Sequence, residues 1–261
     1  MIKKVLIFSL VIWAFGAQAQ RSDNISVERY YSIKKGNVWF KATRLMYGFR
    51  DGIMYPQTET DTIYFYNNMD KPMEYDFKNP PEFLSIQMIP ATIPAKSEGK
   101  IAVAYDTQVK DTYGPTFDYF YMETNDDKMP RKRLIVSPNI KENFSQLTEE
   151  ELKNAPVISF EESEYEFGTI NQGEKINHTF VFANEGQRDL IIRKTKASCG
   201  CTASAPDKKV LAPGEQGTLE VKFNSYGKKG KQRQRITIIS NDPKNPVTKL
   251  YLKGNVVKKA E

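Results

Sequence analysis

The chain has two cysteines, Cys199 and Cys201, which stand on either side of Gly200. With no third thiol, neither can close a long disulfide loop. His178 is the single histidine, so a tetrahedral zinc site would lack ligands. Three uses of the pair remain: a local disulfide, two thiolates that hold a soft ion such as Cu(I), or two thiols that pack in a core.

The spacing of the pair limits its chemistry. In an extended strand, residues i and i+2 lie about 6.6 Å apart, whereas the Cα atoms of a disulfide prefer roughly 5.5–6 Å. A bridge would need a bend at Gly200, and the strained bond would be easily reduced. In an oxidising compartment, neighbouring free thiols stay reduced only when they are buried. We expect a structural role, with redox activity or metal binding at Cys199 and Cys201 as alternatives.

The other polar residues predict no catalytic centre. His178 precedes Thr179 in an alternating strand, which indicates a solvent-facing position without a catalytic role. Carboxylate pairs such as Glu161-Glu162 are adjacent in turns, and no phosphate-binding glycine loop is present. We therefore expect a protein that is not an enzyme and needs no cofactor.

The N-terminus has the pattern of a secretory signal. Lys3 and Lys4 precede an apolar run over residues 5–15, and Ala17-Gln18-Ala19 forms a small-x-small cleavage site. The run is too short for a transmembrane helix, and no later run approaches the roughly 20 apolar residues of a span. We predict a signal peptide over residues 1–19 and a mature protein in the periplasm or outside the cell.

The charge balance argues against a nucleic-acid partner. The formal net charge of +6 falls to +4 when the signal peptide, with its two lysines, is removed, and all 32 acidic residues remain. The basic clusters at 131–133 and 228–235 alternate with apolar or turn residues, which is typical of solvated strand faces.

Short alternating runs between Gly, Pro and Asn turns predict an all-β chain. Such runs include 62–66, 101–105, 179–182, 219–223 and 235–239, each with one apolar face. A single helix is expected between them, because Thr148 and Glu151 form a capping box and Pro156 ends the segment.

The two sides of this helix resemble each other. Asn67 and Asn184 each follow an aromatic strand, residues 93–103 parallel 211–221, and 124–126 parallel 240–242. Because the three matches keep their order and spacing, they indicate two copies of one module. We predict two immunoglobulin-like β-sandwich domains, at 20–140 and 157–257, joined by a helical linker at 141–156.

The second module resembles the bacterial domain-of-unknown-function family fifteen-seventy-three. The similarity lies in an aromatic strand ending at Asn184, the Ser198–Thr202 motif, the Pro213-Gly214 turn, the 240–243 turn and the final strand near Gly254. Such domains are similar to the major-sperm-protein and PapD-like immunoglobulin folds of exported Bacteroidetes proteins. The resemblance implies a fold and no activity.

These observations favour a non-catalytic interaction or scaffolding module of the bacterial cell envelope, with an envelope protein as its partner. The binding surface would be an exposed sheet edge or the aromatic hairpin from 113 to 121. In the hairpin, the candidate residues are Tyr113, Phe117, Tyr119 and Tyr121. The alternative is a periplasmic thiol-redox or copper-binding protein that uses Cys199 and Cys201.

Overall fold

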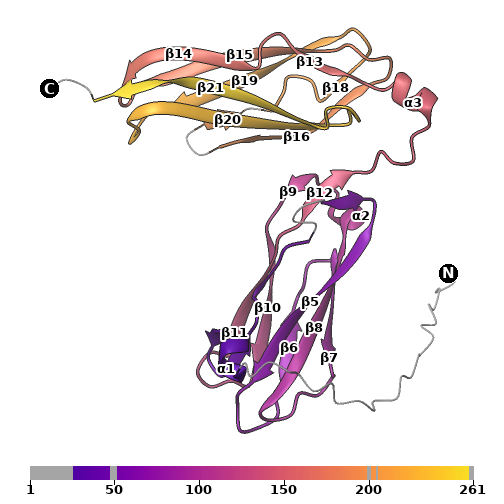
Figure 1. Ribbon diagram of the computed structural model, residues 1–261, viewed down its shortest axis with the longest axis vertical. Coiled ribbons are helices and arrows are strands. Elements are labelled where there is room, and N and C mark those ends of the chain that lie inside the picture. The colour runs from indigo at the N-terminus through magenta and orange to yellow at the C-terminus, as the bar shows by residue number, and fades with distance from the viewer. Residues whose placement is uncertain (1–25, 48–51, 199–200, 204, 259–261) are drawn as a thin grey trace.

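The chain folds into two β-sandwiches joined by a short helical segment (Figure 1). The computed structural model describes residues 26–47, 52–198, 201–203 and 205–258. Each sandwich packs two sheets face to face around its own apolar core. The predicted fold class, tandem immunoglobulin-like domains with a helical linker, is confirmed.

The first domain follows helix α1 (Val27–Tyr30) and contains three sheets. One sheet has the order β1 (Ile33–Lys35), β2 (Val38–Phe40), β5 (Thr58–Asn67), β8 (Ser97–Asp106) and β7 (Leu84–Ile89). The facing sheet runs β3 (Arg44–Leu45), β11 (Arg131–Val136), β10 (Asp118–Thr124) and β6 (Tyr75–Lys78). Helix α2 (Thr107–Lys110) and a small sheet, β4 (Ile53–Tyr55), β12 (Asn139–Glu142) and β9 (Gly114–Pro115), lie at the end nearer the second domain (Figure 1).

The second domain follows helix α3 (Glu149–Lys153), whose start has the predicted capping box between Thr148 and Glu151. One sheet is β13 (Ile158–Phe160), β15 (Lys175–Asn184), β19 (Gln216–Asn224) and β17 (Cys201–Ala203). The other is β14 (Glu164–Asn171), β21 (Val247–Val257), β20 (Gly230–Ser240), β16 (Leu190–Ala197) and β18 (Val210–Leu211).

Period-two alternation builds both cores. In β8, Ile101, Val103 and Tyr105 are fully buried while the residues between them are partly exposed. In β19, Leu219, Val221 and Phe223 do the same. Because successive side chains of a strand point to opposite faces, each such strand places one apolar row against the facing sheet.

The two domains repeat the same buried asparagine. Asn67 is fully buried and donates from Nδ2 to the carbonyls of Lys71 and Pro94, while Oδ1 accepts from Met69 N–H. In the second domain, Asn184 makes the matching set of bonds. It donates to the carbonyls of Arg188 and Leu211 and accepts from Gly186 N–H. A buried amide without hydrogen-bond partners is costly. The repetition of the same bonds in both domains supports the internal duplication.

The turn that joins β10 to β11 in the first domain is repeated between β20 and β21 in the second. Asp126, after β10, accepts from the N–H groups of Asn37 and Lys128 at 2.8 and 3.1 Å. Asp242, after β20, accepts from Ile158 and Lys244 at 3.1 and 2.8 Å. Each carboxylate thus joins a turn of one sheet to the start of a strand or turn in the other sheet.

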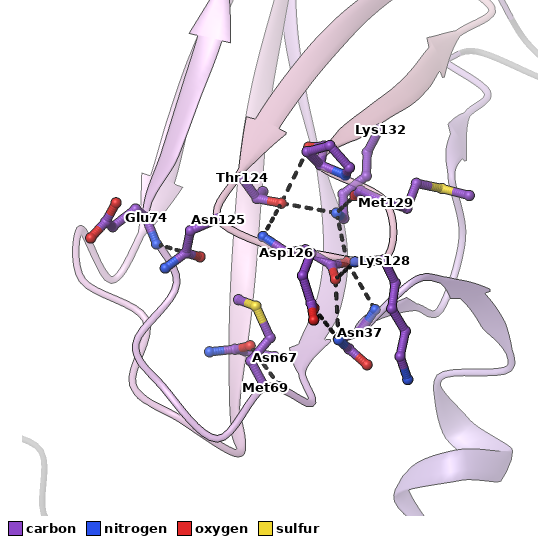
Figure 2. A network of polar contacts seen from close by, with 12 residues as sticks. Asn37, Asn67, Met69, Glu74, Thr124, Asn125, Asp126, Lys128, Met129 and Lys132 are labelled. Carbon is purple, nitrogen blue, oxygen red and sulfur yellow. Dashed lines mark hydrogen bonds and ion pairs between the residues drawn. The ribbon is translucent and has the colours of Figure 1, made fainter.

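In the first domain this carboxylate also binds a buried lysine (Figure 2). The Nζ of Lys132 donates to Asp126 at 3.0 Å, to Thr124 Oγ1 at 2.9 Å and to the Met129 carbonyl. Both charged side chains have no exposed surface. Burial alone would raise the pKa of Asp126, but the hydrogen bonds from Asn37 N–H and Lys132 lower it below its usual value. The carboxylate is therefore held ionised by its partners.

The middle residue of the basic cluster 131–133 thus differs from the prediction. Arg131 and Arg133 are exposed as expected, whereas Lys132 points into the domain. The alternation of β11 requires an inward side chain at this position, and Asp126 provides the countercharge that makes lysine tolerable there.

We expect Lys132→Met to destabilise the protein, because it leaves a buried carboxylate without its cation. Removal of one partner from a buried pair costs about 3–5 kcal/mol. Urea unfolding of the full chain would measure this loss. The control is Lys128→Met in the same turn, where the side chain is exposed; it should change the free energy of unfolding by less than about 0.5 kcal/mol. Equal effects of the two substitutions would contradict the assigned role of Lys132.

Candidate partner-binding site

Aromatic rings and arginines alternate on the outer face of β10 and β11. The guanidinium carbon of Arg131 lies 3.8 Å from the ring centre of Tyr121, and that of Arg133 lies 4.4 Å from the ring centre of Tyr119. The two tyrosine rings meet edge to face at 5.6 Å. These contacts follow from the antiparallel register, in which Tyr121 stands opposite Arg133 and two residue pairs away from Arg131.

Phe117 and Arg44 extend the row. The Arg44 guanidinium lies 4.9 Å from the Phe117 ring centre, and its Nε donates to Ser137 Oγ at 2.9 Å. Phe117 is 62% exposed and Tyr119 is 47% exposed. We call this surface the aromatic–arginine face: Arg44, Phe117, Tyr119, Tyr121, Arg131 and Arg133. The alternate residues Phe120 and Met122 are buried on the inner side of the same strand.

The face carries three arginines, and Glu123 stands opposite Arg131 in the strand register. In the described part of the chain, none of its three arginines lies within ion-pair distance of a carboxylate. A similar stack in the second domain differs in this respect. Arg233 lies 3.6 Å from the Tyr251 ring centre and 3.7 Å from Glu164, whose pKa is lowered by a hydrogen bond from Lys253.

The sequence predicts the three aromatic residues of this face but not its arginines. The cluster 131–133 has the pattern of a solvated strand face, and the stacking depends on strand register. The sequence does contain a signal for this grouping. Two tyrosines lie two residues apart in one strand, and two arginines lie two residues apart in the next strand.

Two parts of the predicted aromatic hairpin need correction. Residues 113–121 do not form a hairpin, because β9 pairs with β12 while β10 pairs with β11 and β6. Tyr113 is only 7% exposed, and burial raises its pKa to about 12. It therefore lies apart from the aromatic–arginine face and is removed from the candidate set.

Tyr113 instead packs between the domains. The Arg193 guanidinium lies 5.0 Å from its ring centre and binds the Glu142 carboxylate through two bonds of 2.6 and 3.1 Å. Lys194 Nζ donates to the Tyr113 carbonyl at 3.0 Å. Next to them, Ile239 fills the space at Gly114, where a Cβ would overlap its side chain. These contacts join the end of the first domain to β16 and β20 of the second.

His178 occupies a different environment from the predicted one. Its ring stacks on Tyr165 at 3.8 Å and meets Phe180 edge to face at 4.6 Å, and Nε2 lies 2.8 Å from Glu162 Oε1. The side chain is 16% exposed. It shares a face of β15 with buried Phe180 and partly buried Ile176, so it lies on the core side of the strand and not on the solvent side.

The cysteine motif lies where the chain changes sheets. β16 ends at Ala197 in one sheet, and β17 begins at Cys201 in the facing sheet. Cys199 and Gly200 lie outside the described residues, so the proposed redox or metal pair is not tested. Backbone pairing places Cys201 opposite Phe223, as Leu84 stands opposite Tyr105 in the first domain. Leu84 is 5% exposed and belongs to the core.

The described residues lack two other features that would indicate a site or an anchor. No three His, Cys, Asp or Glu side chains gather there closely enough to hold a metal ion. None of the helices found there is long and apolar enough to cross a bilayer. Edge strands on which a partner strand could add include β6 and β7 in the first domain and β13 and β17 in the second; binding at an edge stays a prediction.

The second domain matches a known family. Residues 158–256 match the model of the family described as "Protein of unknown function (DUF1573)". The match extends from β13 to the last strand, and it confirms the resemblance drawn from the sequence. The comparison with curated proteins gave no match.

Solved structures resemble the chain in fold. A protein of unknown function from Porphyromonas gingivalis W83 is 17% identical, with a TM-score of 0.60, over 84% of this chain and 100% of that one. A PapD-like domain of human CEP192 is 11% identical over 46% and 96% of the two chains, with a TM-score of 0.33. The YadV chaperone is 12% identical over 83% and 99%, with a TM-score of 0.29. At this identity the first similarity shows a shared fold alone. We infer nothing from the other two structures, because their TM-scores are low.

The register of Cys201 generates a prediction. If this position serves the core as Leu84 does, Cys201→Leu should change the free energy of unfolding by less than about 1.5 kcal/mol, whereas Cys201→Asp should unfold or strongly destabilise the domain. Urea unfolding with and without reductant would measure both. A loss of several kcal/mol in Cys201→Leu relative to the untreated wild type, absent when both proteins are compared in reductant, would instead indicate a disulfide with Cys199 in the wild type, because the variant keeps a single thiol.

Proposed function

We propose that this is a non-catalytic exported protein that binds an acidic partner protein in the bacterial cell envelope through the aromatic–arginine face. The observation that carries the proposal is the set of three exposed guanidinium groups, each stacked on an aromatic ring. The export signal at residues 1–19 supports the location, and the absence of any proposed catalytic set in the sequence supports the lack of turnover.

The stacking prepares the arginines for binding. A guanidinium that lies flat on a ring is held in place, while its edge N–H groups stay free to donate two parallel bonds to a carboxylate. Because the rings fix the side chains before binding, less rotamer entropy is lost on association. Aromatic residues and arginine are also the residue types enriched at protein interfaces.

The charge of the face selects the partner. Three unneutralised arginines repel a basic surface and attract an acidic one, with an attraction that weakens as salt rises. The equivalent stack in the second domain already has Glu164 as its counterion. We therefore assign binding to the first domain and use the second-domain stack as the matched control.

A site-specific photo-crosslinker tests the proposal in envelopes of the source cells. At position 119 it should capture a partner with an acidic surface; at Tyr226, 81% exposed in the second domain, it should not. Adding Arg131→Ala and Arg133→Ala should reduce capture by at least tenfold, since each charge-assisted bond contributes about 1.5–3 kcal/mol. Adding Arg233→Ala should leave capture unchanged.

The substitutions Arg131→Lys and Arg133→Lys separate charge from stacking. Lysine keeps the charge but lacks the flat, bidentate group, so capture should fall to an intermediate level. Equal capture at positions 119 and 226, or capture of the protein by itself alone, would refute the proposal. Circular dichroism of each variant confirms that the domain is folded.

A further inference from the structure

A small basic hollow lies between the two domains. It has a volume of about 150 Å³ and is bounded by β9 of the first domain and by β16 and β20 of the second. Its lining includes the cations Lys194, Lys196 and Arg235, the polar residues Ser198 and Thr237, and Pro115. The register explains the gathering, because Lys196 stands opposite Thr237, and Ser198 N–H bonds to the Arg235 carbonyl.

The three cations have no counterion in the part of the chain that the structure describes. No carboxylate there lies within ion-pair distance of Lys194, Lys196 or Arg235. The acidic group that faces Lys194 from the first domain is Asp118, which is already bound to Lys110 at 2.6 Å and to the Tyr105 hydroxyl at 2.9 Å.

The charged form of Lys194 is destabilised by its surroundings. Its partial burial, followed by repulsion from Lys196 and Lys110, lowers the pKa of Lys194. Its Nζ donates one hydrogen bond, to the Tyr113 carbonyl, so the ammonium group can donate further hydrogen bonds to a ligand. An anion in the hollow would relieve this repulsion.

The size of the hollow limits its ligand. Its volume of about 150 Å³ exceeds the roughly 10–15 Å³ that a single water requires by the same measure. This leaves room for an oxyanion of four or five heavy atoms. The Thr237 hydroxyl adds a neutral hydrogen-bonding group beside the cations. The Ser198 hydroxyl already donates to Gln234 Oε1 at 3.1 Å and accepts from Arg235 N–H at 3.0 Å.

We propose that the hollow bounded by Lys194, Lys196 and Arg235 binds a small oxyanion at the junction of the two domains. The oxyanion is either a free tetrahedral anion, such as inorganic phosphate, or a carboxylate. Because Pro115 closes the hollow from the first domain, the bound anion lies against both domains.

Isothermal titration calorimetry of the full mature chain with inorganic phosphate tests the proposal, with ionic strength held constant by chloride. The wild-type protein should bind one phosphate. Lys196→Ala and Arg235→Ala should each weaken binding about tenfold, the effect of losing one charge-assisted contact. The control is Lys249→Ala, which removes an exposed charge from the neighbouring strand, opposite Thr237 and outside the hollow lining; it should bind like the wild type.

Acetate and sulfate distinguish the two sources of the oxyanion. Competition by acetate supports a carboxylate, and competition by sulfate alone supports a tetrahedral anion. No binding of phosphate, sulfate or acetate by the wild-type protein would overturn the proposal. So would an equal loss of affinity in all three variants, because that pattern indicates a diffuse surface charge. Thermal unfolding of each variant without anion shows that its fold is intact.

Discussion

In each domain a buried aspartate holds the two sheets of the sandwich against each other. Asp126 and Asp242 lie in the turns after β10 and β20, yet their carboxylates accept backbone N–H groups at Asn37 and Ile158 of the facing sheets. Hydrogen bonds to a charged group are stronger than neutral ones. A buried carboxylate that lost them would be costly, so the turn fixes how the sheets are placed. At Gly36, next to Asn37, a side chain would collide with the Asp126 carboxylate.

This constraint reaches the outer surface of the first domain. The turn that contains Asp126 connects β10 to β11 and thereby sets their register. The register in turn decides which arginine lies over which ring. Lys132 shows the coupling most directly, because it stands between Arg131 and Arg133 and is held inward by Asp126. The two arginines must then point outward, toward Tyr121 and Tyr119.

Local patterns predicted the parts of the fold that local physics decides. Alternation identified strands, and the repeated turn at 124–126 and 240–242 identified two related domains, because Asn and Asp satisfy nearby backbone groups. Two side chains were assigned to the wrong side. The burial of Lys132 depends on a distant turn, and the environment of His178 depends on Tyr165, which comes from the facing sheet.

The candidate site was predicted in part for the same reason. Phe117, Tyr119 and Tyr121 share one surface because consecutive alternate residues of a strand do so. Tyr113 precedes β9 and is covered by Arg193 of the other domain. No pattern within 113–121 could report that contact. The arginines of the face come from β3 and β11. Arg131 and Arg133 meet the tyrosines through the register of the consecutive strands β10 and β11, whereas Arg44 joins them through the pairing of β3 with β11, which are far apart in sequence.

The domain junction relates the aromatic–arginine face to the basic hollow. β9 contributes Pro115 to the hollow, and the chain then passes through Phe117 into β10, where the face begins. Screening limits attraction between exposed charges to about 8 Å at physiological salt, so cations act together on one ligand only when their spacing is maintained. Here the bidentate hydrogen bond from Arg193 to the Glu142 carboxylate and the packing of Ile239 against Gly114 maintain this spacing. The hollow therefore depends on both domains, because Pro115 comes from the first and its cations come from the second.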